Sequence, residues 1–173
     1  MTFLPPTERR SSAALIARDD GVRLRLRSYD RKFAVPHDLA HFVAEQTFGL
    51  EHGVWGSIAA GAMFDSMTVI SGRLRHDSRQ RSTTLLKANQ RELVLAEVLA
   101  GVVHQGLHHS NAALARELNE AWGALREGPC PFTPSQAHNG VAELAALAEQ
   151  WTATTPEHGL NLTWPSRRPT GKR

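Results

Sequence analysis

The chain has 173 residues, of which 41% are hydrophobic and 21% are charged, with one cysteine, Cys130. This composition predicts a globular protein with an apolar core and no internal disulfide, and a net charge of +3 with 6% aromatic residues argues against a dedicated nucleic-acid binder. Because no apolar stretch approaches ~18 residues and the first ten residues lack the pattern of a secretory signal, we expect a cytoplasmic protein that does not insert into a membrane.

The patterning divides the chain into three segments. Residues 1–11 hold two prolines followed by polar residues, and residues 166–173 are basic with no apolar side chain to bury. We therefore expect a flexible arm over 1–11 and a disordered basic tail over 166–173. Residues 12–165 between them are expected to form a single globular domain.

A β-hairpin is predicted at the start of this domain. Residues 12–18 and 22–28 alternate apolar and polar side chains on either side of Asp19-Asp20-Gly21, and an Asp-Gly pair supplies the positive φ of tight hairpin turns. In the second run an apolar face alternates with a face of three arginines, Arg23, Arg25 and Arg27. The apolar face is therefore expected in the core and the arginine face in solvent.

Helical spacing of apolar residues follows the hairpin. It predicts five helices, over residues 36–49, 54–67, 84–106, 111–128 and 139–151. A basic loop is expected over 71–83 and a short strand over 160–164. The predicted fold class is α+β, with a small antiparallel sheet, made of the N-terminal hairpin and the C-terminal strand, packed on four to five helices.

The first predicted helix carries two histidines one turn apart. His37 and His41 present their imidazoles on one face, with Cα atoms about 6 Å apart, so both can reach one transition-metal ion. His37 lies in the first turn, where the helix dipole favours the neutral ring that binds metal. The alternative is a surface His37 and a hydrogen-bonded core His41 with no metal.

A third ligand has to come from outside this face. Glu45 is eight residues from His37, about 12 Å along a helix, so it is better suited to orient His41 than to share its ion. Two groups can complete the ligand set: Glu51 and His52, just after the turn at Gly49, and His104 and His108, a second pair at four-residue spacing.

The five residues His37-Asp38-Leu39-Ala40-His41 resemble the HDxxH motif of the mostly helical zinc proteins of ubiquinone biosynthesis. The resemblance implies a bound divalent ion near a hydrophobic substrate groove. That family places a glutamate twelve positions after the second histidine, where this chain has Gly53, so the closing glutamate is not matched.

These residues predict a small metal-dependent enzyme of hydrolase or lyase type. A zinc or iron ion would activate a water or polarise a carbonyl of a small-molecule substrate. Asp38 or Glu45 would serve as the general base or would orient a ligand. The sequence leaves the substrate open, and it leaves open whether the chain forms a homo-oligomer.

The alternative function is a non-catalytic binding module. Arg23, Arg25 and Arg27 of the hairpin, with Arg73 and Arg75 of the basic loop, would engage an acidic partner or nucleic acid through salt-dependent contacts. A solvated sheet face explains the same arginines without a partner.

Overall fold

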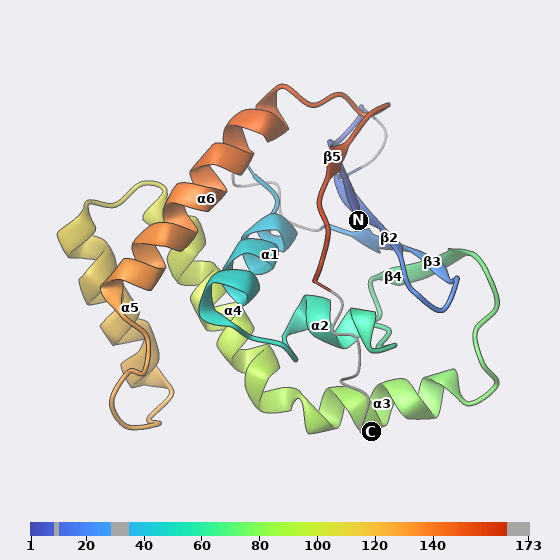
Figure 1. The fold of residues 1–173 in the computed structure, drawn as a ribbon, viewed down its shortest axis with the longest axis horizontal. Coiled ribbons are helices and arrows are strands. Elements are labelled where there is room, and N and C mark those ends of the chain that lie inside the picture. The colour runs from blue at the N-terminus through green and yellow to red at the C-terminus, as the bar shows by residue number, and fades with distance from the viewer. Residues whose placement is uncertain (9–10, 29–34, 166–173) are drawn as a thin grey trace, which may run out of the picture.

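Three strands near the N-terminus and two from later in the chain form one antiparallel sheet (Figure 1). The computed structural model describes residues 1–8, 11–28 and 35–165, and in these the sheet has five strands in the order β4-β3-β2-β1-β5. Their bounds are β1 Thr2–Leu4, β2 Ala13–Ala17, β3 Arg23–Arg27, β4 Met67–Ser71 and β5 Leu160–Asn161.

The predicted hairpin is confirmed as β2 and β3. Gly21 takes a φ of 79° in the turn between them, a conformation that glycine adopts without steric cost. Leu24 and Leu26 are buried while Arg23 and Arg27 are exposed, so the apolar face of β3 enters the core as expected.

The N-terminus differs from the predicted flexible arm. Residues 2–4 form β1, which pairs with β2 on one side and with β5 on the other. Phe3 is 1% exposed and its ring packs edge-on against Phe42 and Trp55. Burial of this aromatic ring holds the segment in the sheet, and the prolines that suggested an arm come only after it. The expected tail at 166–173 lies outside the described residues.

Six helices accompany the sheet in the described part of the chain, which confirms the α+β class. Their bounds are α1 His37–Phe48, α2 Val54–Ala59, α3 Ser78–Ala88, α4 Gln90–Gly106, α5 Asn111–Ala124 and α6 Pro134–Thr152. In Figure 1 the sheet lies on one side of α1, and α4, α5 and α6 lie on the other. None of these helices is long and apolar enough to span a bilayer.

Six predicted boundaries are wrong. The helix expected over 111–128 stops at Ala124, and the strand expected over 160–164 stops at Asn161. The helix expected over 54–67 ends at Ala59, and β4 begins at Met67. The basic loop expected over 71–83 becomes helical at Ser78, and the helix expected over 84–106 is two helices that meet at Asn89. The last long helix begins at Pro134 rather than at residue 139, because Thr133 and Gln136 form a reciprocal capping box.

Candidate metal centre

The helix that carries the two histidines begins and ends close to where the sequence predicts. Pro36 is the N-cap, with φ −60° and ψ 140°, so His37 occupies the first helical position. At the other end Gly49 takes a left-handed φ of 69°, and the N–H groups of Gly49 and Leu50 bond to carbonyls of the last turn. This frame places His37 and His41 on neighbouring turns of α1, with ring centroids 4.8 Å apart.

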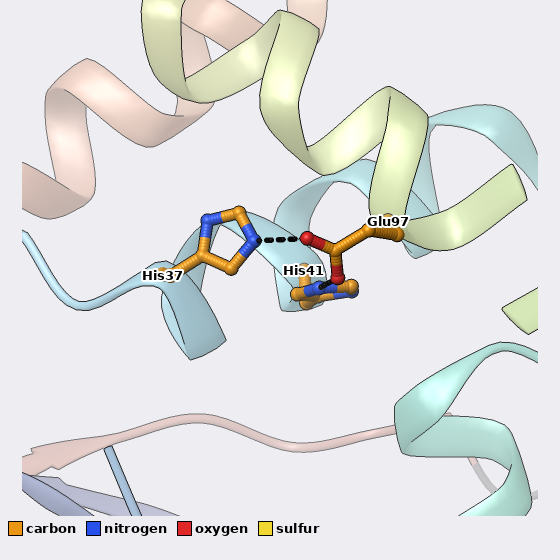
Figure 2. Close-up of side chains that lie close together, drawn as sticks. All are labelled: His37, His41 and Glu97. Atoms are coloured by element: carbon orange, nitrogen blue, oxygen red, sulfur yellow. Dashed lines mark hydrogen bonds and ion pairs between the residues drawn. The ribbon is translucent and has the colours of Figure 1, made fainter. Parts of the chain in front are cut away.

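Glu97 of α4 reaches both histidines (Figure 2). Its Oε1 lies 3.3 Å from His37 Nε2, and its Oε2 lies 3.1 Å from His41 Nε2. One ligand-capable atom from each of the three side chains lies within 4.8 Å of the others. The contact is built by packing, because α4 lies against α1 through its buried face, which includes Leu99 and Val103.

The donor set suits a transition metal. Two imidazoles and one carboxylate are the three protein ligands of a common type of catalytic zinc site, and they also suit non-haem iron(II). Atoms that ligate a tetrahedral zinc at 2.0–2.1 Å lie about 3.3 Å from one another. The two contacts to Glu97, at 3.1 and 3.3 Å, involve different oxygens of the carboxylate, and each is close to that spacing.

The three side chains differ in burial. The His41 side chain is 6% exposed, that of His37 is 27% exposed and that of Glu97 is 69% exposed. The ring of His41 therefore forms the floor of the cluster, and the Glu97 side is open to water. Solvent and a small solute can approach the three donor atoms from this side.

A buried carboxylate supports His41 from behind. Glu45 is 1% exposed and its Oε1 lies 3.4 Å from His41 Nδ1, an ion-pair contact. The same carboxylate accepts hydrogen bonds of 2.9 Å from the backbone N–H groups of Val54 and Trp55, at the start of α2. Glu45 is thus held by two backbone donors with its Oε1 beside the ring, and because it is buried it does not face the open side as a general base must.

The structure shows why residue 53 is a glycine. A Cβ atom at this position would lie 2.5 Å from Glu45 Cδ, so the Glu45 carboxylate occupies the space of any side chain at residue 53. In this chain the carboxylate that faces the histidines comes instead from α4, at Glu97.

The charges of the cluster depend on one another. Burial disfavours the charged form of the His41 ring, but the carboxylates of Glu45 and Glu97 outweigh it and raise the pKa of His41 to about 9. Hydrogen bonds from His37 and His41 hold the pKa of Glu97 well below its usual range. Burial raises the pKa of Glu45, against the opposing effects of His41 and of the N–H groups of Trp55 and Val54. Two carboxylates thus surround two imidazoles, and a bound dication would balance their charge.

His104, predicted as a ligand, lies behind His37. Its Nδ1 is 3.2 Å from His37 Nδ1, the two rings are stacked at 24°, and the residue is 2% exposed. His104 is therefore a partner of the far nitrogen of His37 and does not belong to the group of three ligand-capable side chains.

The remaining predicted ligands also lie outside this group. Glu51 and His52 are exposed in the turn after α1, where the His52 N–H donates to Glu92 and the Glu51 carbonyl packs against Gly56. These contacts hold the turn against α2 and α4, so Glu51 and His52 are not brought next to His37. His108 is exposed beyond the end of α4, since the helix stops at Gly106.

Asp38, the other candidate general base, is half-buried in the first turn of α1, and its carbonyl accepts a hydrogen bond of 3.1 Å from Trp55 Nε1. This bond ties the start of α1 to α2 on the side that also holds Glu45.

The arginines of the alternative function are spread over the sheet and the following loop. Arg23 and Arg27 are exposed on β3, and Arg25 is half-buried between them. Arg73 is exposed in the segment before α3, and Arg75 forms an ion pair of 3.4 Å with Asp77. Exposed and half-buried arginines thus occur on β3 and in the segment before α3.

Sequence reasoning missed Glu97, although a signal for it was present. Glu97 and His104 are seven residues apart, so they lie on the same face of α4 two turns apart. Ala100 between them is fully buried, and its small side chain allows a neighbouring helix to approach closely. A carboxylate and an imidazole at this spacing on a second helix complement His37 and His41 on the first.

Comparison of the chain with protein-family models, with curated proteins and with solved structures finds no match.

Proposed function

We propose that the chain is a metal-dependent enzyme of hydrolase or lyase type, with a zinc or iron(II) ion held by His37, His41 and Glu97. The observation that carries the proposal is the convergence of two imidazole nitrogens and a carboxylate from two packed helices. The likeness of His37–His41 to the HDxxH motif also favours a divalent ion, with Glu97 in place of the glutamate that the family has at the position of Gly53.

A surface ion-pair cluster is the competing explanation of the same contacts. Two features favour the metal. Glu45 is a buried carboxylate beside the far nitrogen of His41, and a carboxylate on the far nitrogen is a partner that proteins often give to a ligating histidine. The nitrogens that face Glu97 are the Nε2 atoms of both rings, one beside each oxygen of the carboxylate, so both imidazoles direct the same atom toward one side chain.

Three protein ligands leave a coordination position for water or substrate. The ion would lower the pKa of a water bound there or polarise a substrate carbonyl. The chain supplies the rest. His41 and its partner Glu45 form a rigid floor, and the exposed Glu97 leaves an approach for a small-molecule substrate. Asp38 follows the first histidine directly, the position that a general base occupies in zinc helices of the H-E-x-x-H type. We assign Asp38 the role of general base. We also propose that the protein is cytoplasmic.

The first test is metal content. We expect about one equivalent of zinc or iron, by elemental analysis, in protein purified without a histidine tag. The double variant H37A/H41A should contain less than a tenth of that amount, while H108A/H109A, which removes two histidines outside the cluster, should keep it. Hydrolysis of 4-nitrophenyl acetate should be faster with the metal-loaded protein than with the chelator-treated protein. Equal metal in the wild type and in H37A/H41A would reject the site.

A further inference from the structure

The contact between His37 and His104 carries a further inference, which rests on the proposed function. His104 is nearly fully buried at 2% exposure, on the face of α4 that packs against α1. Its Nδ1 lies 3.2 Å from His37 Nδ1, and the near-parallel rings have centroids 5.5 Å apart. Burying an imidazole costs free energy unless its nitrogens are hydrogen-bonded. The contact with His37 gives Nδ1 of the buried His104 ring a partner.

Two facing nitrogens bond only if one carries a proton and the other does not. When His37 gives its Nε2 lone pair to a metal ion, the neutral ring carries its proton on Nδ1. That proton points at His104, whose Nδ1 must then be the acceptor. Metal ligation therefore fixes the tautomers of both rings, with the His104 proton on Nε2.

We propose that His104 is a positioning residue, which accepts the Nδ1 proton of His37 and holds that ring with Nε2 toward the ion. His41 has an equivalent partner in Glu45, which faces its Nδ1. Each histidine thus has one buried partner on its far nitrogen, a carboxylate for His41 and a neutral imidazole for His37. The neutral partner leaves His37 less electron-rich than His41, so the two ligands differ in strength although both use Nε2.

The test compares three variants by titrating metal-free protein with Zn²⁺. H104L removes the acceptor and keeps an apolar side chain, and H104N retains a carbonyl oxygen that can reach the place of Nδ1. V103A is the structural control, because Val103 is fully buried on the same helix and its truncation weakens the core without touching His37. All three are checked by circular dichroism and thermal unfolding.

We expect the Kd for Zn²⁺ to rise 10- to 100-fold in H104L, as for other lost partners of ligating histidines, and by less than about 3-fold in H104N and V103A. In ¹⁵N-histidine spectra of the zinc-loaded wild type, His37 should show a proton on Nδ1 that exchanges slowly with water. In zinc-loaded H104L this proton should exchange fast.

The outcomes separate the two claims. If the wild type binds no Zn²⁺, the proposed function fails, and the inference fails with it. If the wild type and H104L bind Zn²⁺ equally, the metal site stands and the role of His104 is rejected. If V103A loses as much affinity as H104L, or if H104N is as weak as H104L, His104 acts through packing alone, and the inference is again rejected.

Discussion

Substituting Glu97 with glutamine should weaken Zn²⁺ binding by on the order of 100-fold or more, because the variant removes one of three protein ligands and its negative charge. The Glu97 carboxylate is the only group from α4 in the cluster of ligand-capable atoms found among the described residues. A neutral carboxamide is a poor ligand for zinc, and it does not offset the positive charge of the ion as a carboxylate does. Isothermal titration with Zn²⁺ measures the change.

The stability of E97Q should change far less than its metal affinity. The Glu97 side chain is 69% exposed, so its ion pairs with the histidines are screened by water and contribute about 0.5–1 kcal/mol to the free energy of unfolding. E143Q is the matched control, because Glu143 is an exposed glutamate on α6. Wild-type affinity in E97Q would contradict the assignment of the third ligand.

Substituting Glu45 with leucine should destabilise the protein by about 3–5 kcal/mol. The variant leaves the buried N–H of Trp55 and the part-buried N–H of Val54 without an acceptor, and it removes the counter-charge beside His41. E45Q keeps one carbonyl oxygen and should lose roughly half as much. Urea unfolding of the metal-free protein measures both losses.

The exposed position Glu143 again supplies the control, since E143L should stay within about 0.5 kcal/mol of the wild type. E45Q should also bind Zn²⁺ more weakly, by about 10-fold, because His41 loses a charged partner on its far nitrogen. A loss below about 1 kcal/mol in E45L would show that the Glu45 network does not hold α2 against α1.

The elements with strong local signals could be predicted from the sequence. The Asp-Gly turn and the alternation around it define β2 and β3, and Pro36 and Gly49 bracket α1. The strand β1 could not be predicted in the same way, because three residues carry little pattern. Its pairing with β5 depends on a partner 159 residues away, as in the Thr2 hydroxyl bond to Asn161.

In the candidate site, too, residues on one helix could be predicted from their spacing, and a residue from another helix could not. His37, His41 and the supporting position of Glu45 follow from helical spacing within one helix. Glu97 is 56 residues beyond His41, and only the packing of α4 on α1 brings it close. The turn after Gly49 suggested Glu51 and His52, but the hydrogen bond to Glu92 and the close approach to Gly56 direct that turn elsewhere.

The most direct test of the metal centre is X-ray absorption at the zinc edge of the zinc-loaded protein. We expect zinc to have nitrogen and oxygen neighbours at about 2.0–2.1 Å, with the outer-shell scattering of two imidazoles. This imidazole signal should disappear in H37A/H41A and persist in H108A/H109A. A wild-type spectrum without imidazole scattering, or one unchanged in H37A/H41A, would contradict a zinc ion held between α1 and α4.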